Sequence, residues 1–250
     1  MNPQIEGEAG DAFNSEAAGD KLDLELPGLQ KLLLEKVAAT GTPVILVAVS
    51  GSALALPEEL AAGVIQCFYP GAEGGTALAE ILAGKVNPSG RLPVTFYRGA
   101  NDLPSFDDYA MEGRTYRFFR GEVLHPFGFG LSYTSFAYRD LVVPGKIVAG
   151  EILPVRLTVV NTGVLSGETV VELYVSAVNP PTRSPIRQLA AVKRIALAPG
   201  ESVQTELAIG PESFLLTFDD GSRKLLPGLW KVEASFDSMT PAAEAEVRLE

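Results

Sequence analysis

The side chains that form disulfides and bind transition metals are almost missing from this sequence. The chain has one cysteine, Cys67, and one histidine, His125. A single cysteine excludes an internal disulfide. A transition-metal site is also unfavourable, because such sites draw heavily on histidine and cysteine ligands. We therefore expect no metal, and we interpret His125 as a structural histidine whose hydrogen bonds are satisfied.

Long apolar runs and an excess of basic residues are missing too. No apolar stretch reaches the roughly 18 residues that a transmembrane helix needs. Residues 1–6 have neither the basic region nor the apolar region of a secretory signal peptide. The chain carries 20 basic and 31 acidic side chains, a net charge of −11. Because such a surface repels nucleic acid and anionic membranes, we expect neither as a partner.

Two common catalytic or binding motifs are also not found. The glycines of Gly71–Gly75 are not followed by the Lys-Ser/Thr of a phosphate-binding loop. Gly51-Ser52 and Gly130–Tyr133 both lack the Gly-x-Ser-x-Gly frame of a nucleophile elbow. These observations disfavour a nucleotide-binding protein and a serine hydrolase.

The first half of the sequence predicts helices that alternate with buried strands. Pro27–Ala39 places Leu29, Leu32, Leu33 and Val37 on one helical stripe. Two continuous apolar runs, at residues 44–49 and 64–68, are typical of parallel strands buried on both faces, and residues 58–62 form a helical piece between them. This order indicates an α/β layer. Two strands are fewer than the usual sheet of about four to six, so we expect the layer to be incomplete.

From Phe136 the pattern changes to short strands separated by turns, which is typical of a β-sandwich. Pro199-Gly200-Glu201 and Asp219-Asp220-Gly221 are predicted to be hairpin turns. Trp230, the only tryptophan, is predicted to lie in the core. The expected strands cover residues 154–160, 170–175, 188–196, 202–209, 214–218, 229–236 and 243–249.

The most specific stretch of the chain is Tyr69–Phe96, YPGAEGGTALAEILAGKVNPSGRLPVTF. It resembles the C-terminal α/β sandwich domain of family-three glycoside hydrolases, the β-glucosidases and β-xylosidases. Glu112–Tyr133, EGRTYRFFRGEVLHPFGFGLSY, resembles the segment that leads from that domain into a fibronectin-III-like β-domain. The resemblance implies a partial α/β sandwich followed by an all-β, fibronectin-III-like (immunoglobulin-like) sandwich. We expect the first domain over residues 1–115, a connecting segment over 116–135 and the second domain over 136–250.

The same resemblance gives the acidic N-terminal stretch a chemical role. Xylosidase-like members carry an EGE or EAE motif, then Gly-Asp-Arg, then an apolar LxLP, and this chain has Glu6-Gly7-Glu8, Gly19-Asp20-Lys21 and Leu24–Pro27. The family's general acid/base lies in this loop, which implies Glu8 as the candidate and Glu6 as the alternative. Lys21 replaces the usual arginine. Lysine keeps the charge but cannot make the two parallel hydrogen bonds of a guanidinium group.

Retaining glycoside hydrolysis needs a second carboxyl group as nucleophile. In the resembled family this is an aspartate on a (β/α)8 barrel domain N-terminal to the sandwich, whereas these 250 residues are filled by the partial sandwich and the β-domain. The resemblance therefore implies the C-terminal portion of a retaining β-glycosidase, which needs no cofactor. Its partners would be a β-linked glucoside or xyloside and a barrel, which a separate chain could supply. Without a leader the default location is the cytoplasm, although family members are often periplasmic or secreted.

A second class of function stays open on the sequence alone. The chain could be a non-catalytic module that binds carbohydrate or protein through its β-domain. Residues 97–135 mix carboxylates with aromatic rings, which can stack on sugars, but we favour a linker packed over the domain junction.

Overall fold

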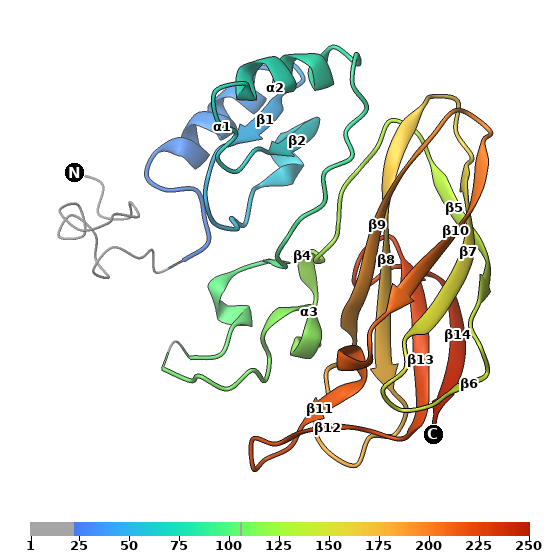
Figure 1. The fold of residues 1–250 in the computed structure, drawn as a ribbon. Coiled ribbons are helices and arrows are strands. Elements are labelled where there is room, and N and C mark those ends of the chain that lie inside the picture. The colour runs from blue at the N-terminus through green and yellow to red at the C-terminus, as the bar shows by residue number, and fades with distance from the viewer. Residues whose placement is uncertain (1–22, 106) are drawn as a thin grey trace. The chain divides into compact units, whose positions relative to one another are not determined.

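The computed structural model describes residues 23–105 and 107–250, and the chain forms two compact units that interleave along the sequence (Figure 1). The first unit contains the described residues up to 80 together with 95–113 and 120–125. The second unit contains residues 81–94, 114–119 and 126–250. The domain boundaries at residues 115 and 136 stay a prediction.

The first unit contains the predicted α/β elements. Helix α1 (Gln30–Ala38), strand β1 (Ile45–Ala48), the 3-10 helix η2 (Glu58–Leu60) and strand β2 (Gly63–Gln66) follow in that order. Strands β1 and β2 pair in parallel, with Ile45 opposite Gly63, which confirms both predicted strands (Figure 1). Their predicted burial on both faces is wrong, because Ile45 is 48% exposed and no residue of β2 is fully buried. Helix α2 (Gly74–Leu82) begins in this unit, which also holds η3 (Ala100–Asp102) and the antiparallel pair β3 (Phe96–Tyr97) and β4 (Val123–His125).

The apolar stripe of α1 is exposed, although the sequence period predicted its helix correctly. Leu29 and Leu33 are 76% and 65% exposed, and Leu32 and Val37 are exposed as well. The one buried residue of the helix is Leu34, which lies off that stripe. A helical stripe is normally apolar because it packs against another element, and none of the described elements covers this one. In the part of the chain that the structure describes, no helix is long and apolar enough to cross a membrane.

The second unit is a sandwich of two sheets (Figure 1). One sheet has the order β10-β7-β5, formed by Ser202–Ile209, Leu153–Asn161 and Phe136–Val142. The other has the order β6-β14-β13-β8-β9, formed by Lys146–Ile147, Pro241–Leu249, Gly228–Ser235, Gly167–Ala177 and Gln188–Leu197. The short helices α3 (Thr115–Phe118) and η4 (Pro211–Phe214) and the hairpin of β11 (Leu215–Thr217) and β12 (Arg223–Leu225) complete the unit.

The core of the sandwich lies between the two sheets. Alternate residues of β7, from Leu153 to Val159, are fully buried, as a strand with one face on a core requires. Trp230 is buried among them, which confirms its prediction as a core residue. Its indole Nε1 donates a hydrogen bond to the Leu226 carbonyl at 2.9 Å, and its ring meets Phe214 edge to face at 5.1 Å. The sandwich therefore has a continuous core of its own.

Of the two predicted hairpin turns, one is correct. Asp219-Asp220-Gly221 joins the antiparallel strands β11 and β12. Pro199-Gly200-Glu201 joins β9 to β10, and these strands belong to different sheets, so the hairpin prediction was wrong there. The turn chemistry is the same in both cases, because Gly200 and Gly221 have φ values of +72° and +78°. Turn residues specify the local reversal, whereas the burial of each strand decides which sheet it joins.

We expect limited proteolysis to cleave the first unit before the second. The first unit has a two-stranded parallel sheet and an exposed apolar helix stripe, whereas the second has a continuous core. Segments with few buried contacts open more readily and are cut there. Trypsin digestion followed by mass spectrometry should leave a resistant β-sandwich fragment, and the intact chain should self-associate in light scattering. An equally resistant first unit in a demonstrated monomer would contradict this expectation.

Candidate functional site

The candidate general acid/base residues Glu6 and Glu8 lie outside the described residues, as does Gly19-Asp20-Lys21. The structure begins at the apolar motif that follows this loop in the sequence. There, the Ala55 backbone N–H donates to the Leu24 carbonyl at 2.7 Å, and the Glu25 N–H donates to Asp23 Oδ1 at 2.9 Å. The first bond fixes Leu24 to the connection between β1 and β2, and the second organises the segment locally.

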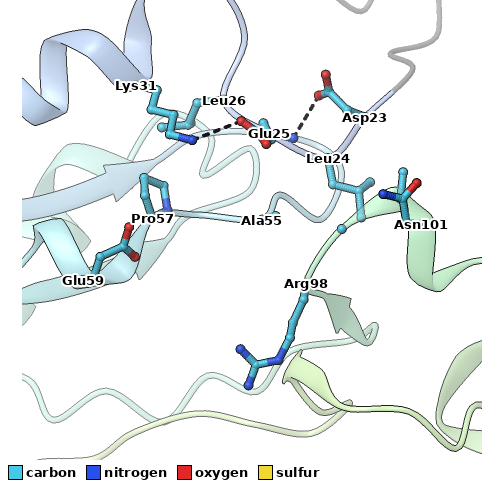
Figure 2. Close-up of a pocket in the computed structure, with 12 residues that line it drawn as sticks. Asp23, Leu24, Glu25, Leu26, Lys31, Ala55, Pro57, Glu59, Arg98 and Asn101 are labelled. Carbon is cyan, nitrogen blue, oxygen red and sulfur yellow. Dashed lines mark hydrogen bonds and ion pairs between the residues drawn. The ribbon is translucent and has the colours of Figure 1, made fainter.

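A cavity of about 350 Å³ lies directly beside this anchored end (Figure 2). Three stretches of the first unit form it. Its walls are made by residues 23–26 with Lys31 from α1, by Ala55, Pro57 and Glu59 from the connection between β1 and β2, and by residues 98–101. Figure 2 shows Glu25 and Lys31 on one wall and Arg98 on another.

The lining of this cavity mixes hydrogen-bond donors with acceptors. Lys31 Nζ lies 3.3 Å from Glu25 Oε2, and Arg98 Nε lies 3.6 Å from Glu122 Oε2. Both ion pairs are solvent-exposed, so they add little to stability. Arginine and carboxylate groups can, however, donate to and accept from the hydroxyl groups of a sugar. The cavity therefore offers both hydrogen-bond donors and acceptors to a ligand.

Two carboxylates of residues 97–113 are used in local turns. Asp102 Oδ2 accepts the Gly99 N–H at 3.2 Å, and Asp108 Oδ1 accepts the Ala110 N–H at 2.8 Å. These bonds organise the segment itself, and its role as a linker stays a prediction. Tyr109 is 91% exposed, so its ring packs on no core.

His125 has the structural role that its sequence context predicted. Its Nε2 lies 2.5 Å from Glu58 Oε1, which ties β4 to η2 within the first unit. Both side chains are partly buried. Among residues 23–105 and 107–250, no group of three or more His, Cys, Asp or Glu side chains is arranged to hold a metal ion.

Sequence reasoning missed the residues that line the cavity. The sequence indicated only that Lys31 is a polar position of an amphipathic helix. It placed Glu59 in a short helical piece and Arg98 in an irregular segment. Nothing in their spacing brings these three stretches together, because their juxtaposition depends on the tertiary fold. The apolar Leu24–Pro27 motif was the one available signal, since it marks where the chain enters the fold.

The comparisons with known families agree with this architecture. The model of the Glycosyl hydrolase family 3 C-terminal domain matches residues 2–133, and that of the Fibronectin type III-like domain matches residues 169–238. The first match covers more than half of the chain and includes both the acidic stretch and the Tyr69–Phe96 motif. The chain therefore belongs to glycosyl hydrolase family 3, and its second unit is a fibronectin-III-like sandwich.

Curated relatives are β-glycosidases that are considerably longer than this chain. A xylan 1,4-beta-xylosidase of Xylanibacter ruminicola is 38% identical over 237 residues, which are 92% of this chain and 27% of the relative. A periplasmic beta-glucosidase of Salmonella typhimurium is 31% identical over 242 residues, which are 88% of this chain and 31% of the relative. The chain thus spans about a third or less of the length of these relatives.

Solved structures show the same relationship. The GH3 beta-glucosidase of Bifidobacterium adolescentis superposes with a TM-score of 0.84 and 30% identity, over 95% of this chain and 37% of that chain. A beta-glucosidase from Listeria innocua, solved in complex with glucose, superposes with a TM-score of 0.81 and 26% identity, over 94% of this chain and 35% of that chain. The order of the α/β layer and the β-sandwich is therefore shared with β-glucosidases of known structure.

Proposed function

We propose that this chain is the C-terminal portion of a retaining β-glycosidase that hydrolyses β-glucosides or β-xylosides. The observation that carries the proposal is the family match over residues 2–133, which includes the Glu6-Gly7-Glu8 motif. Relatives with this architecture are named as β-xylosidases and β-glucosidases. In the proposed mechanism Glu8 donates a proton to the leaving-group oxygen and later activates water, with Glu6 as the alternative.

The anchored end of the acidic loop supports this role. Catalytic carboxyl groups must be held within hydrogen-bond reach of the reacting oxygen. The bond from Ala55 to Leu24 fixes the chain 16 residues after Glu8 in the sequence. The neighbouring cavity, lined by donors such as Arg98 and acceptors such as Glu59, suits sugar hydroxyl groups.

The nucleophile is proposed to come from a (β/α)8 barrel outside these 250 residues. Two observations in the first unit support a missing polypeptide neighbour. The stripe of Leu29, Leu32, Leu33 and Val37 is exposed on α1, and β1 pairs only with β2 among the described strands. The relatives are about three times as long, and their additional residues could cover the exposed apolar stripe of α1.

The test is to assay the purified chain alone and together with a barrel portion, using aryl β-glucosides and β-xylosides. The chain alone should show no significant hydrolysis, because a general acid without its nucleophile lacks half of the mechanism. Addition of the barrel portion, taken from a preceding or neighbouring reading frame, should produce turnover.

Two outcomes would overturn the proposal. Turnover by the chain alone, lost on Glu8→Ala substitution, would show that it carries its own nucleophile, and Asp102, Asp107 and Asp108 would be the first candidates. If the barrel portion gives no turnover but the chain binds oligosaccharides, the non-catalytic carbohydrate-binding module is the correct interpretation.

A further inference from the structure

Strand β8 is buried on both faces, and one of these faces carries a carboxylate. Val171, Leu173 and Val175 point into the sandwich core. Glu172 and Tyr174 lie on the opposite face of the sheet and are only 3% and 0% exposed. Glutamate is rarely so deeply buried without a charged partner, because desolvation disfavours its ionised form. The chain segments that cover this face therefore decide how the carboxylate behaves.

Gly128 covers the carboxylate, and we call the two hydrogen-bonded stretches around it, residues 90–92 and 126–129, the clamp. The Gly128 N–H donates to the Leu92 carbonyl at 2.8 Å, and the Leu92 N–H donates to the Phe129 carbonyl at 2.9 Å. The Ser238 N–H, from the turn after β13, donates to the Phe127 carbonyl at 2.8 Å. These three bonds hold the two parts of the clamp to each other and to the sheet.

The clamp lies in direct contact with the carboxylate. Gly128 has a φ of +85°, and a Cβ on it would overlap both carboxylate oxygens of Glu172, lying 2.6 Å from Oε1. Only glycine allows this approach of the backbone. Water cannot therefore reach the carboxylate from this side unless the clamp lifts.

Several ionisable side chains surround Glu172. Tyr174 donates its hydroxyl hydrogen to Glu172 Oε2 at 2.5 Å, and the ring of Tyr116 from α3 meets the Tyr174 ring edge to face at 5.8 Å. Arg91, within the clamp, attracts the carboxylate, while Asp237, in the turn after β13, repels it. Tyr138 from β5 and Arg194 from β9 act on Arg91 in turn.

Burial is the largest of these effects, and it raises the pKa of Glu172 to about 7 from the ordinary 4.5. The Tyr174 hydrogen bond lowers this pKa, Asp237 raises it further, and Arg91 lowers it. The neutral carboxyl group is therefore retained under mildly acidic conditions while the clamp covers it. If the clamp lifts, the group becomes hydrated and its pKa returns toward the ordinary value.

We propose that Glu172 is a proton-dependent lock, which holds the clamp on the β-sandwich when it is neutral and loosens the clamp when it ionises. An ionised carboxylate gains hydration only by exposing itself, so ionisation favours the lifted state. The chain passes between the two units at Val94–Thr95 and at His125–Pro126, directly beside the clamp. The lock would thus make the attachment of these crossing segments sensitive to pH. It rests on the β-sandwich alone and is independent of the proposed hydrolysis.

The direction of the pH dependence follows from the pKa values of Glu172 in the closed and lifted states. The pKa of Glu172 is about 7 in the closed state and near 4.5 once hydrated. Between these values the closed state holds a proton that the lifted state does not. The opening equilibrium constant should therefore rise by up to about tenfold per pH unit between pH 4.5 and 7, and stay level above pH 7.

The test is hydrogen exchange of the full chain at pH 5, 6, 7 and 8, corrected for intrinsic exchange rates. The reporters are the amides of Leu92, Gly128 and Ser238, which donate the three bonds of the clamp. Their protection should fall at least tenfold from pH 5 to 7 and change little from 7 to 8. Glu172→Gln should abolish this dependence, whereas Glu246→Gln, at an exposed position on β14, should behave like the unsubstituted chain.

Two further variants separate the lock from a merely structural carboxylate. Tyr174→Phe removes the donor that favours ionisation, so the fall in protection should extend to higher pH. Asp237→Asn removes the repelling charge, so the fall should level off at lower pH. These opposite shifts also test the proposed lock if Glu172→Gln fails to fold. Protection without pH dependence, an unchanged dependence in Glu172→Gln, or variants that do not shift it would overturn the proposal.

Discussion

Replacing Glu8 by alanine is expected to lower kcat/KM of the barrel-supplemented enzyme by about 10²–10⁴-fold for substrates with poor leaving groups. General acid catalysis contributes an effect of this order, because the leaving oxygen must gain a proton as the glycosidic bond breaks. Oligosaccharide substrates have such leaving groups. The measurement is the initial rate of release of glucose or xylose from β-linked disaccharides, compared between the variant and the unsubstituted chain.

The leaving group provides an internal control for this prediction. Nitrophenyl glycosides need little protonation, so their glycosylation step should be affected much less by the Glu8→Ala substitution. A merely misfolded variant would lose activity on both substrate types equally.

Glu6→Ala is the matched control for position, because the two glutamates flank a single glycine. It should have a milder effect than Glu8→Ala. If the order of the two effects reverses, Glu6 is the general acid/base and the motif assignment is shifted by two residues. If neither substitution changes the rate on disaccharides, the acidic loop does not supply the acid.

Replacing Phe214 by alanine is expected to destabilise the β-sandwich by about 3–5 kcal/mol, the usual cost of removing a buried phenylalanine. Phe214 is 1% exposed and contacts Trp230 edge to face. The substitution removes both the transfer free energy of the ring and its contacts, and leaves a cavity. The loss is a large part of the stability of an ordinary domain, which is about 5–15 kcal/mol.

The measurement is guanidinium chloride unfolding followed by tryptophan fluorescence. Trp230 is the only tryptophan of the chain, so this signal reports on the sandwich and not on the first unit. Val164→Ala is the control, because Val164 is 86% exposed and its truncation should change the free energy of unfolding by less than about 0.5 kcal/mol. A loss below about 1 kcal/mol for Phe214→Ala would mean that the core repacks around the missing ring.

The sequence was most informative where one face of an element is buried. Strand β7 alternates buried and less buried residues along its whole length, and its position was predicted to within one residue at each end. Strand β8 was predicted as well, but its burial on both faces was not, because Glu172 reads as a solvent-facing residue in an alternating strand. The glycine that covers it, Gly128, is 44 residues away in the sequence. No local sequence pattern can predict a contact between residues so far apart in the chain.

The candidate site, too, could be predicted only in part from the sequence. The resemblance identified Glu6 and Glu8 by motif, and their roles stay a prediction because they lie outside the described residues. The cavity beside Leu24 had no motif beyond Leu24–Pro27, because Arg98 and Glu59 reach it from separate stretches. Local sequence can indicate a catalytic loop, whereas the surroundings of that loop depend on contacts between distant segments.

The interleaving of the two units has a consequence for how this protein can be taken apart or recombined. The β-sandwich unit includes residues 81–94 and 114–119 in addition to everything after His125. Arg91 and Tyr116, which lie beside Glu172 and Tyr174, come from these earlier segments. A chimera that transplants the sandwich as one uninterrupted block would leave behind part of its outer layer. Gene fusion and exon exchange should therefore tend to preserve residues 81–250 together, so that the sandwich is inherited with the segments of the first unit at residues 95–113 and 120–125.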